Sequence, residues 1–374
     1  SNMLNASKWT QIVLVTLLTS TAVATEPRIN EVQVIGTHNS YHIEQNDAMM
    51  SIIRQNGART ADSIQYTHRP LREQFDELGI RQIELDVYAD PDGGHYAQPK
   101  GQQVLVEQGL PVGPDPDPEG KLSKPGLKVL HFPDYDFRST VLTFRDALQQ
   151  VRQWSQQHPR HFPIMIMVEV KGGKLPPRYT QPIRFSKAEL DLIDQEIASV
   201  FDDDEIISPD SVRGTYPTLR EAVLKQGWPS ISAARGKVIF ALDNGGEIRD
   251  HYLEGHPSLQ GRNLFASVDA GHEAAAFMKL NYPVGQFDHI LAMVRQGFLI
   301  RTRADGGTDE ARRTDTSQRE KAFASGAQLI STDYPEPDPR FRDYRVRFKN
   351  ERVVRANPVN GKPTQADLEE LDSQ

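Results

Sequence analysis

Short apolar runs recur along the chain, and most of them are rich in β-branched residues, as buried parallel strands are. Residues 164–168, with the sequence Ile-Met-Ile-Met-Val, are the clearest example. The expected strands cover residues 32–36, 81–88, 127–132, 163–170, 237–242, 264–269, 298–303 and 328–333.

Between several of these runs, apolar residues follow the spacing of amphipathic helices. Three such faces are expected, formed by Leu71, Phe75 and Leu78, by Phe144, Leu148, Val151 and Trp154, and by Leu190, Ile193, Ile197 and Val200. Ser186 with Glu189 and Thr218 with Glu221 have the spacing of capping boxes. Strands that alternate with helices imply parallel pairing through right-handed crossovers. Eight such units favour an α/β fold closed into a (β/α)8 TIM barrel over an open sheet.

Two insertions follow expected strands, at residues 89–126 and 172–185. Both leave the carboxyl ends of strands, so they would lie over the active face of a barrel as lids or substrate walls. The first insertion carries apolar residues that could touch a membrane, namely Val104, Leu105, Val106, Leu110 and Val112.

The N-terminus has the features of a secretory signal peptide covering residues 1–24. Lys8 precedes an apolar stretch, and Ala22-Val23-Ala24 is a small-residue cleavage site. The apolar stretch is short for a membrane span, although an uncleaved anchor is the alternative. We therefore expect a secreted or periplasmic protein with one catalytic domain at residues 25–340, a partly disordered C-terminal extension at 341–374, and no transmembrane segment in the mature chain.

Composition narrows the classes of partner. The 374 residues are 37% hydrophobic, enough for one large core, and contain no cysteine, so stability rests on the core and not on disulfides. The net charge is −8 and no basic block stands out, which argues against a nucleic-acid partner. A monomer is expected.

Histidines and acids recur where the expected strands end. The gaps are 46 residues from His38 to Glu84, 45 from Asp86 to His131, and 38 from His131 to Glu169. That spacing suggests one strand-plus-helix unit each time, which would gather these groups at one rim of the barrel.

Glu84 and Asp86 are two residues apart on a strand and should face the same way. Paired carboxylates suggest a cation between them, although two solvated surface acids are the alternative. Glu169 ends a very apolar strand, where an acid is costly unless it binds a metal or forms a salt bridge, here with Lys171. With the amide of Asn39, these oxygens suit Ca²⁺ or Mg²⁺ and leave His38 and His131 free for proton transfer.

Arg301 and Arg303 leave the seventh expected strand on one face. They could clamp an anionic substrate such as a phosphate, or pair with Asp305 or Asp333 instead. The other histidines follow no such pattern and are expected to be exposed or structural: His42, His68, His95, His158, His161, His251, His256, His272 and His289.

The segment Thr37-His38-Asn39-Ser40, together with Glu84-x-Asp86, His131 and Glu169, resembles the catalytic domain of Ca²⁺-dependent phosphoinositide phospholipase C in its secreted, single-domain bacterial form. The resemblance covers nearly all of the chain after the signal peptide and weakens after residue 335. Each motif alone is moderately specific, whereas the ordered set is strong. It implies a phospholipase-C-like phosphodiesterase barrel that acts on a phospholipid at a membrane surface.

The resemblance also implies roles for individual residues. Asn39, Glu84, Asp86 and Glu169 would hold Ca²⁺, with Mg²⁺ the less expected ion. His38 would stabilise charge on the pentacoordinate phosphorus, and His131 would be the general acid toward the leaving alkoxide or the partner of that acid. Glu84 or Glu169 would take the proton of the inositol 2-hydroxyl. The expected substrate contacts, Lys171, Arg301 and Arg303, come from the residues themselves and not from the resemblance.

Two alternatives remain open at this stage, and the first is a metal-dependent phosphodiesterase for soluble glycerophosphodiesters or for another phospholipid headgroup. Glycerophosphodiester phosphodiesterases resemble the same Glu-x-Asp, His and Glu pattern, and their Glu-x-Lys is similar to Glu169-x-Lys171, but Arg-Gly usually follows their first histidine. A non-catalytic barrel that binds sugar or lipid is the other alternative. In multidomain eukaryotic relatives, an aromatic residue stacks on inositol at the position that Arg303 takes here, which puts the inositol contacts in doubt.

Overall fold

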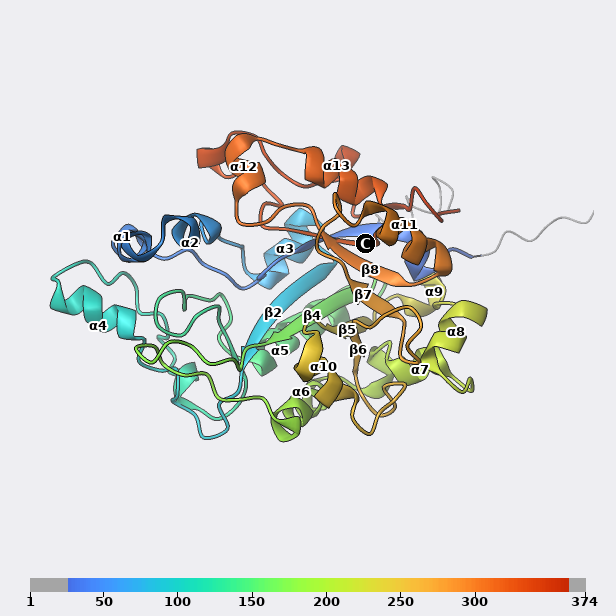
Figure 1. Cartoon of the computed structure of the whole chain (residues 1–374), viewed down its shortest axis with the longest axis horizontal. Helices are drawn as coiled ribbons and strands as arrows, with labels where there is room; N and C mark the ends of the chain where they lie inside the picture. The colour runs from blue at the N-terminus through green and yellow to red at the C-terminus, as the bar shows by residue number, and fades with distance from the viewer. Residues whose placement is uncertain (1–25, 363–374) are drawn as a thin grey trace, which may run out of the picture.

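The computed structural model describes residues 26–362, and its centre is a nearly closed barrel of parallel strands surrounded by helices (Figure 1). Neighbouring strands follow the order β6-β5-β4-β2-β1-β9-β8-β7, and a parallel bridge between Ser267 and Phe277 links β6 to β7. The barrel strands are β1 Val32–Thr37, β2 Gln82–Tyr88, β4 Ile164–Val170, β5 Val238–Leu242, β6 Leu264–Ala266, β7 Phe277–Lys279, β8 Leu299–Arg303 and β9 Leu329–Thr332. The predicted α/β barrel is confirmed.

Helices pack around this barrel and in its insertions. The α-helices are α1 Asp47–Asn56, α2 Ala58–Ser63, α3 Leu71–Leu78, α4 Lys100–Glu107, α5 Phe144–Gln157, α6 Lys187–Val200, α7 Pro209–Arg213, α8 Leu219–Lys225, α9 Ile231–Ala234, α10 Gly246–Leu253, α11 Phe287–Gln296, α12 Asp309–Arg313 and α13 Ser317–Ala324. Short 3₁₀ helices are η1 Ile29–Glu31, η2 Lys121–Ser123, η3 Asp203–Glu205, η4 Pro339–Phe341 and η5 Lys349–Glu351.

The predicted amphipathic faces are the buried faces of α3, α5 and α6. In α5, the Thr143 side chain accepts a hydrogen bond from the backbone N–H of Asp146 and so satisfies a free donor of the first turn. The capping box of Ser186 and Glu189 is present at the start of α6. Burial of one face and capping of the first turn therefore explain where these helices form.

The predicted third barrel strand, residues 127–132, is wrong. Only Lys128–Val129 is a strand, β3, and it pairs antiparallel with the end of β2 through Val87 and Tyr88. Helix α4 lies between β2 and β3 in the sequence but packs against α1 in the first insertion, and the chain returns beside β2 as an antiparallel extension. His131 therefore reaches the barrel mouth from a loop after β3, and the spacing of one strand-plus-helix unit does not apply to it.

The barrel strand that the hydrophobic pattern missed is β7, Phe277–Lys279. It is three residues long and follows the alanines 274–276. So short a run carries little β-branched or alternating signal. It takes its place because its backbone pairs in parallel with β8 from Phe277↔Leu299 to Lys279↔Arg301.

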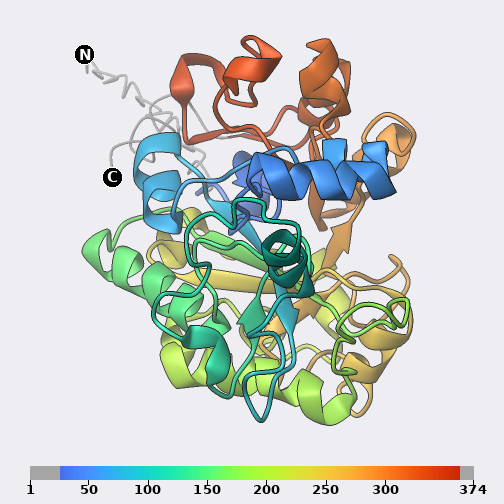
Figure 2. The ribbon, with the colours of Figure 1, turned by 90° about the vertical axis from the view of Figure 1, so that its left-hand side faces the viewer.

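The two predicted insertions extend the barrel at one end. Helices α1, α2 and α4 lie together there (Figure 1) and face the viewer in Figure 2. Leu105 of α4 is buried against α1, whereas Val106, Leu110 and Val112 remain exposed. The apolar patch predicted in this insertion is therefore smaller than the sequence indicated.

Both ends of the chain extend past the described residues. The expected signal segment, residues 1–24, lies outside them, as do the last twelve residues of the expected C-terminal extension. The described part of that extension contains η5 and β10 Val354–Ala356, which pairs antiparallel with β1. Within residues 26–362, no helix combines the length and the apolar character needed to cross a bilayer.

A buried ion pair between Lys128 and Asp90 holds β3 against the base of the first insertion. The Nζ of Lys128 lies 2.9 Å from a carboxylate oxygen of Asp90, and both side chains are 1% exposed. Nζ also donates to the carbonyl oxygens of Lys124 and Gly126. The loop that carries His131 therefore starts from a buried electrostatic anchor.

Lys128→Met should lower the free energy of unfolding by roughly 3–5 kcal/mol, because it leaves the Asp90 carboxylate buried without a counterion. The double variant Lys128→Met/Asp90→Leu removes both charges and should regain most of that loss. Urea unfolding followed by tryptophan fluorescence at pH 7 measures both values. A double variant no more stable than the single one would contradict this account of the anchor.

Candidate active site

The end of β1 is tied to β2 by Ser40. Its backbone N–H donates to the carbonyl oxygen of Glu84, and its hydroxyl accepts from the backbone N–H of Glu84. Asn39 adopts a left-handed backbone with φ of 45°, which asparagine tolerates better than most residues. This turn lets the chain reverse while the side chains of His38 and Asn39 stay at the barrel mouth.

His38 is held by Asp333, which directly follows β9. Nδ1 of His38 lies 2.8 Å from a carboxylate oxygen of Asp333, and Arg303 reaches the other oxygen at 3.4 Å. Burial and the neighbouring guanidinium of Arg303 lower the pKa of His38 well below its ordinary value. The imidazole is therefore neutral at pH 7, with Nδ1–H donated to Asp333 and a lone pair on Nε2.

Glu84 forms an ion pair across the barrel mouth with Arg301 of β8. The guanidinium donates to both carboxylate oxygens, at 2.6 and 2.8 Å, and the amide of Gln82 adds a third hydrogen bond. The side chains are 5% and 2% exposed. Arg301 was expected either to clamp an anionic substrate or to pair with Asp305 or Asp333. It forms an ion pair, but its partner is Glu84.

Asp86 and Glu169 face each other as direct partners in the register of β2 and β4. The hydroxyl of Tyr41 donates to Asp86 at 2.6 Å, and the Nζ of Lys171 lies 3.2 Å from Glu169. Burial, followed by the charge of Glu169, raises the pKa of Asp86 well above its ordinary value. Burial alone would lower the pKa of Lys171, but Asp86 and Glu169 raise it. One lysine therefore faces two carboxylates that repel each other.

The predicted ligand set is brought together only in part. Among the described residues, Glu84, Asp86 and Glu169 do not offer three oxygens within 4.8 Å of one another, because Glu84 is turned to Arg301. Asn39 is buried nearby and donates its amide N–H to Tyr66, which leaves its oxygen free of that bond. Asp86 and Glu169 carry two negative charges, and Lys171 offsets only one of them. Their oxygens, together with the amide oxygen of Asn39, suit a hard divalent cation.

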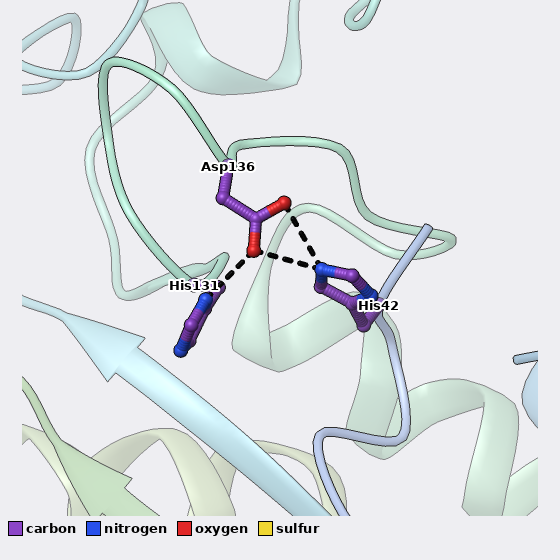
Figure 3. Close-up of side chains that lie close together, drawn as sticks. All are labelled: His42, His131 and Asp136. Carbon is purple, nitrogen blue, oxygen red and sulfur yellow. Dashed lines mark hydrogen bonds and ion pairs between the residues drawn. The ribbon is translucent and has the colours of Figure 1, made fainter. Parts of the chain in front are cut away.

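His131 is positioned by a carboxylate that it shares with His42 (Figure 3). Nδ1 of His131 lies 2.7 Å from Oδ2 of Asp136, and Nε2 of His42 lies 2.8 Å from the same oxygen. Figure 3 shows the second ring nitrogen of His131 pointing away from Asp136. The carboxylate thus fixes the ring of His131 and leaves its Nε2 for chemistry.

His42 is a buried cation in this arrangement. Both of its nitrogens face acceptors, the carbonyl oxygen of Tyr66 at 2.8 Å and the Asp136 carboxylate, so both carry protons. Burial alone would lower the pKa of His42, but Asp136 raises it. Burial would likewise raise the pKa of Asp136, but the two histidines lower it to about 2. Since neither nitrogen of His42 has a free lone pair, we exclude this trio as a metal site.

Sequence reasoning missed several of these residues. Asp333 had been considered only as a partner for an arginine, and Asp243, which follows β5 and pairs with Lys279 of β7, had not been considered. Both are acids just past a strand, the same signal that singled out Glu169. Asp136 and His42 carry no such signal, because both lie in loops. His42 was expected to be exposed or structural. It is buried, and its contact with Asp136 links it to His131.

Comparison with known proteins bears on this geometry. A family model described as "Phosphoinositide phospholipase C, Ca2+-dependent" matches residues 27–358. The chain belongs to this family. It is thus a phosphoric diester hydrolase of the phosphoinositide phospholipase C type, and the match does not favour the glycerophosphodiesterase alternative. No curated protein matches the chain.

Solved structures show the same fold. The apo form of a calcium-dependent phosphoinositol-specific phospholipase C from a Pseudomonas species is 16% identical, with a TM-score of 0.52 over 88% of this chain and 95% of that one. The myo-inositol complex of the Pseudomonas enzyme is 17% identical, with a TM-score of 0.51 over 88% and 96%.

Asp136→Asn should lower phospholipase C turnover about 10- to 100-fold, because a neutral amide no longer balances the charge of His42 and holds the ring of His131 by a weaker hydrogen bond than a carboxylate does. Asp92→Asn, an exposed change of the same chemistry, is the control. Turnover and KM are measured together, with circular dichroism to check folding. A folded Asp136→Asn protein with the turnover of the wild type would contradict this role of Asp136.

Proposed function

We propose that this chain is a secreted phospholipase C that uses Ca²⁺ to cleave phosphatidylinositol into diacylglycerol and a cyclic inositol phosphate. The observation that carries the proposal is a matched pair of histidines at the barrel mouth. In each, Nδ1 is held by a buried aspartate, Asp333 or Asp136, and Nε2 is left for chemistry. In-line phosphoryl transfer needs one such group at the attacking oxygen and one at the leaving oxygen.

His38 is the group we assign to the attacking oxygen. Its neutral imidazole takes the proton of the inositol 2-hydroxyl on Nε2, and Asp333 stabilises the imidazolium that forms. This differs from the charge-stabilising role that the family resemblance implies. In this proposal Glu84 is not the base, because both of its carboxylate oxygens accept hydrogen bonds from Arg301.

His131 is the group we assign to the leaving oxygen. It donates the proton on Nε2 to the alkoxide of diacylglycerol as the bond from phosphorus to that oxygen breaks. Asp136 keeps the ring in the orientation that presents Nε2. The 2-oxygen of inositol has meanwhile bonded to phosphorus, so the second product is a cyclic phosphate that water can open.

Asp86, Glu169 and the amide of Asn39 are the residues we assign to Ca²⁺, and Lys171 neutralises the acid pair from its other side. When bound, Ca²⁺ would offset the negative charge of the phosphate and favour ionisation of the attacking hydroxyl. Arg303 and Lys171 remain the candidates for contacts with the anionic headgroup. Arg301 supports the site through Glu84 instead.

The remaining expectations belong to the same proposal. The exposed apolar residues of the first insertion are Val106 of α4 and, just after that helix, Leu110 and Val112, and we propose that they meet the bilayer. Secretion is proposed from the charged, apolar and small-residue regions of the N-terminal sequence. We further propose that the enzyme acts as a monomer.

Phosphorus NMR of phosphatidylinositol incubated with the protein tests the reaction. With Ca²⁺ present, a cyclic inositol phosphate signal should appear, and excess chelator should abolish it, because the acid pair then has only Lys171 to offset its charge. Release of sn-glycerol 3-phosphate from glycerophosphoinositol, with no turnover of the lipid, would overturn the proposal and point to a glycerophosphodiesterase.

His38→Ala and His131→Ala should each lower turnover by at least ~100-fold while the protein stays folded, since each removes one of the two proton-transfer groups. His289→Ala, on the exposed face of α11, is the matched control and should retain full turnover. Near-wild-type turnover in either active-site variant, measured with the same lipid and Ca²⁺ concentration, would refute the role of that histidine.

A further inference from the structure

A cavity of about 500 Å³ lies beside His131. One wall comes from helices α1 and α2, and the other comes from two loops, at residues 131–136 and 175–179. Its volume is typical of small-molecule sites. The apolar part of its wall comes from Ile53 and Ile64 on the helical side and from Tyr135, Leu175 and Tyr179 on the loops. We call it the α1–α2 cavity.

The cavity touches only one side of the active site. Its wall includes His131 and Asp136, but none of the residues assigned to the metal, and not His38. The attacking and leaving oxygens lie on opposite sides of phosphorus in an in-line displacement. A headgroup attacked near His38 therefore directs the leaving oxygen toward His131, and whatever that oxygen carries extends toward this cavity.

The covering loops are held in place by Asp134, which is buried. Its carboxylate accepts from the backbone N–H of Thr180 at 2.6 Å and from the Thr180 hydroxyl at 2.8 Å. The rings of Tyr135 and Tyr179 meet edge to face, with centroids 5.9 Å apart. The cavity is thus a built feature that joins the loop of His131 to the second insertion.

The wall of the cavity includes an exposed aromatic residue. Phe132, which is 39% exposed, is part of its wall, and α1, α2 and α4 share one end of the molecule (Figures 1 and 2). Val106 of α4 is 67% exposed at that end. Arg178, whose guanidinium lies over the ring of Tyr179 at 4.5 Å, offers hydrogen-bond donors to ester carbonyls.

We propose that the α1–α2 cavity binds the diacylglycerol side of the substrate, namely the glycerol backbone and the first carbons of one acyl chain. The inference rests on the proposed function, because it uses His131 as the proton donor to the leaving oxygen. Apolar walls favour acyl carbons over a sugar or a second headgroup, and the exposed ring of Phe132 offers an apolar contact at the surface. The chain then recognises both halves of its lipid.

Asn56→Trp tests the proposal by filling the cavity from an exposed position at the end of α1. Gln55→Trp is the matched control, since Gln55 is also exposed and does not line the cavity. Each variant is assayed on dihexanoyl phosphatidylinositol below its micelle concentration and on the methyl ester of inositol 1-phosphate, whose leaving group is methanol. The kcat/KM for dihexanoyl phosphatidylinositol, divided by that for the methyl ester, should fall on the order of tenfold in Asn56→Trp and stay unchanged in Gln55→Trp.

Binding of dihexanoylglycerol, measured by calorimetry, gives a second readout that needs no turnover. The wild type and Gln55→Trp should bind it, and Asn56→Trp should not; Leu175→Trp, on the opposite wall, should behave like Asn56→Trp if the first variant does not fold. An unchanged substrate ratio in a folded cavity variant, or no binding to the wild type, overturns the inference. A wild type that binds dihexanoylglycerol but cleaves neither substrate overturns the proposed function instead.

Discussion

The ion pair between Glu84 and Arg301 is the constraint on which the rest of the site depends. It joins β2 to β8 across the barrel mouth, over β1 and β9, with both side chains almost fully buried. Two charges held in so dry a place are stable only together. The pair therefore fixes where the carboxyl ends of these strands lie, and it removes Glu84 from the group of acids that are free to bind a cation.

Charge compensation then orders the other groups around this pair. Asp333 is balanced by Arg303 and holds His38, and Asp136 is balanced by His42 and holds His131. Asp86 and Glu169 are different, because they share Lys171 alone. Asp86 and Glu169 therefore keep surplus negative charge, which is the physical basis on which we propose Ca²⁺ there.

The two histidines are alike in their support and different in their surroundings. Each donates Nδ1–H to an aspartate, but His38 lies beside the arginine-rich end of β8, whereas His131 borders the apolar α1–α2 cavity. In our proposal, this difference directs the polar headgroup to one side of phosphorus and the lipid backbone to the other. The loop after β3 and the insertion after β4 matter to this division, since the first carries His131 and both line the cavity.

The sequence by itself determined the barrel class, three of the outer helices and the strand-end residues His38, Asp86, Glu169 and Arg301, because hydrophobic periodicity and strand ends are local signals. Only the tertiary structure decided that residues 127–132 do not form a barrel strand, that β7 does, and that Glu84 faces Arg301. It also brought His42, Asp136 and Asp333 to the two catalytic candidates. These outcomes depend on which groups meet across long stretches of chain, and burial together with charge pairing makes that choice only once the barrel has closed.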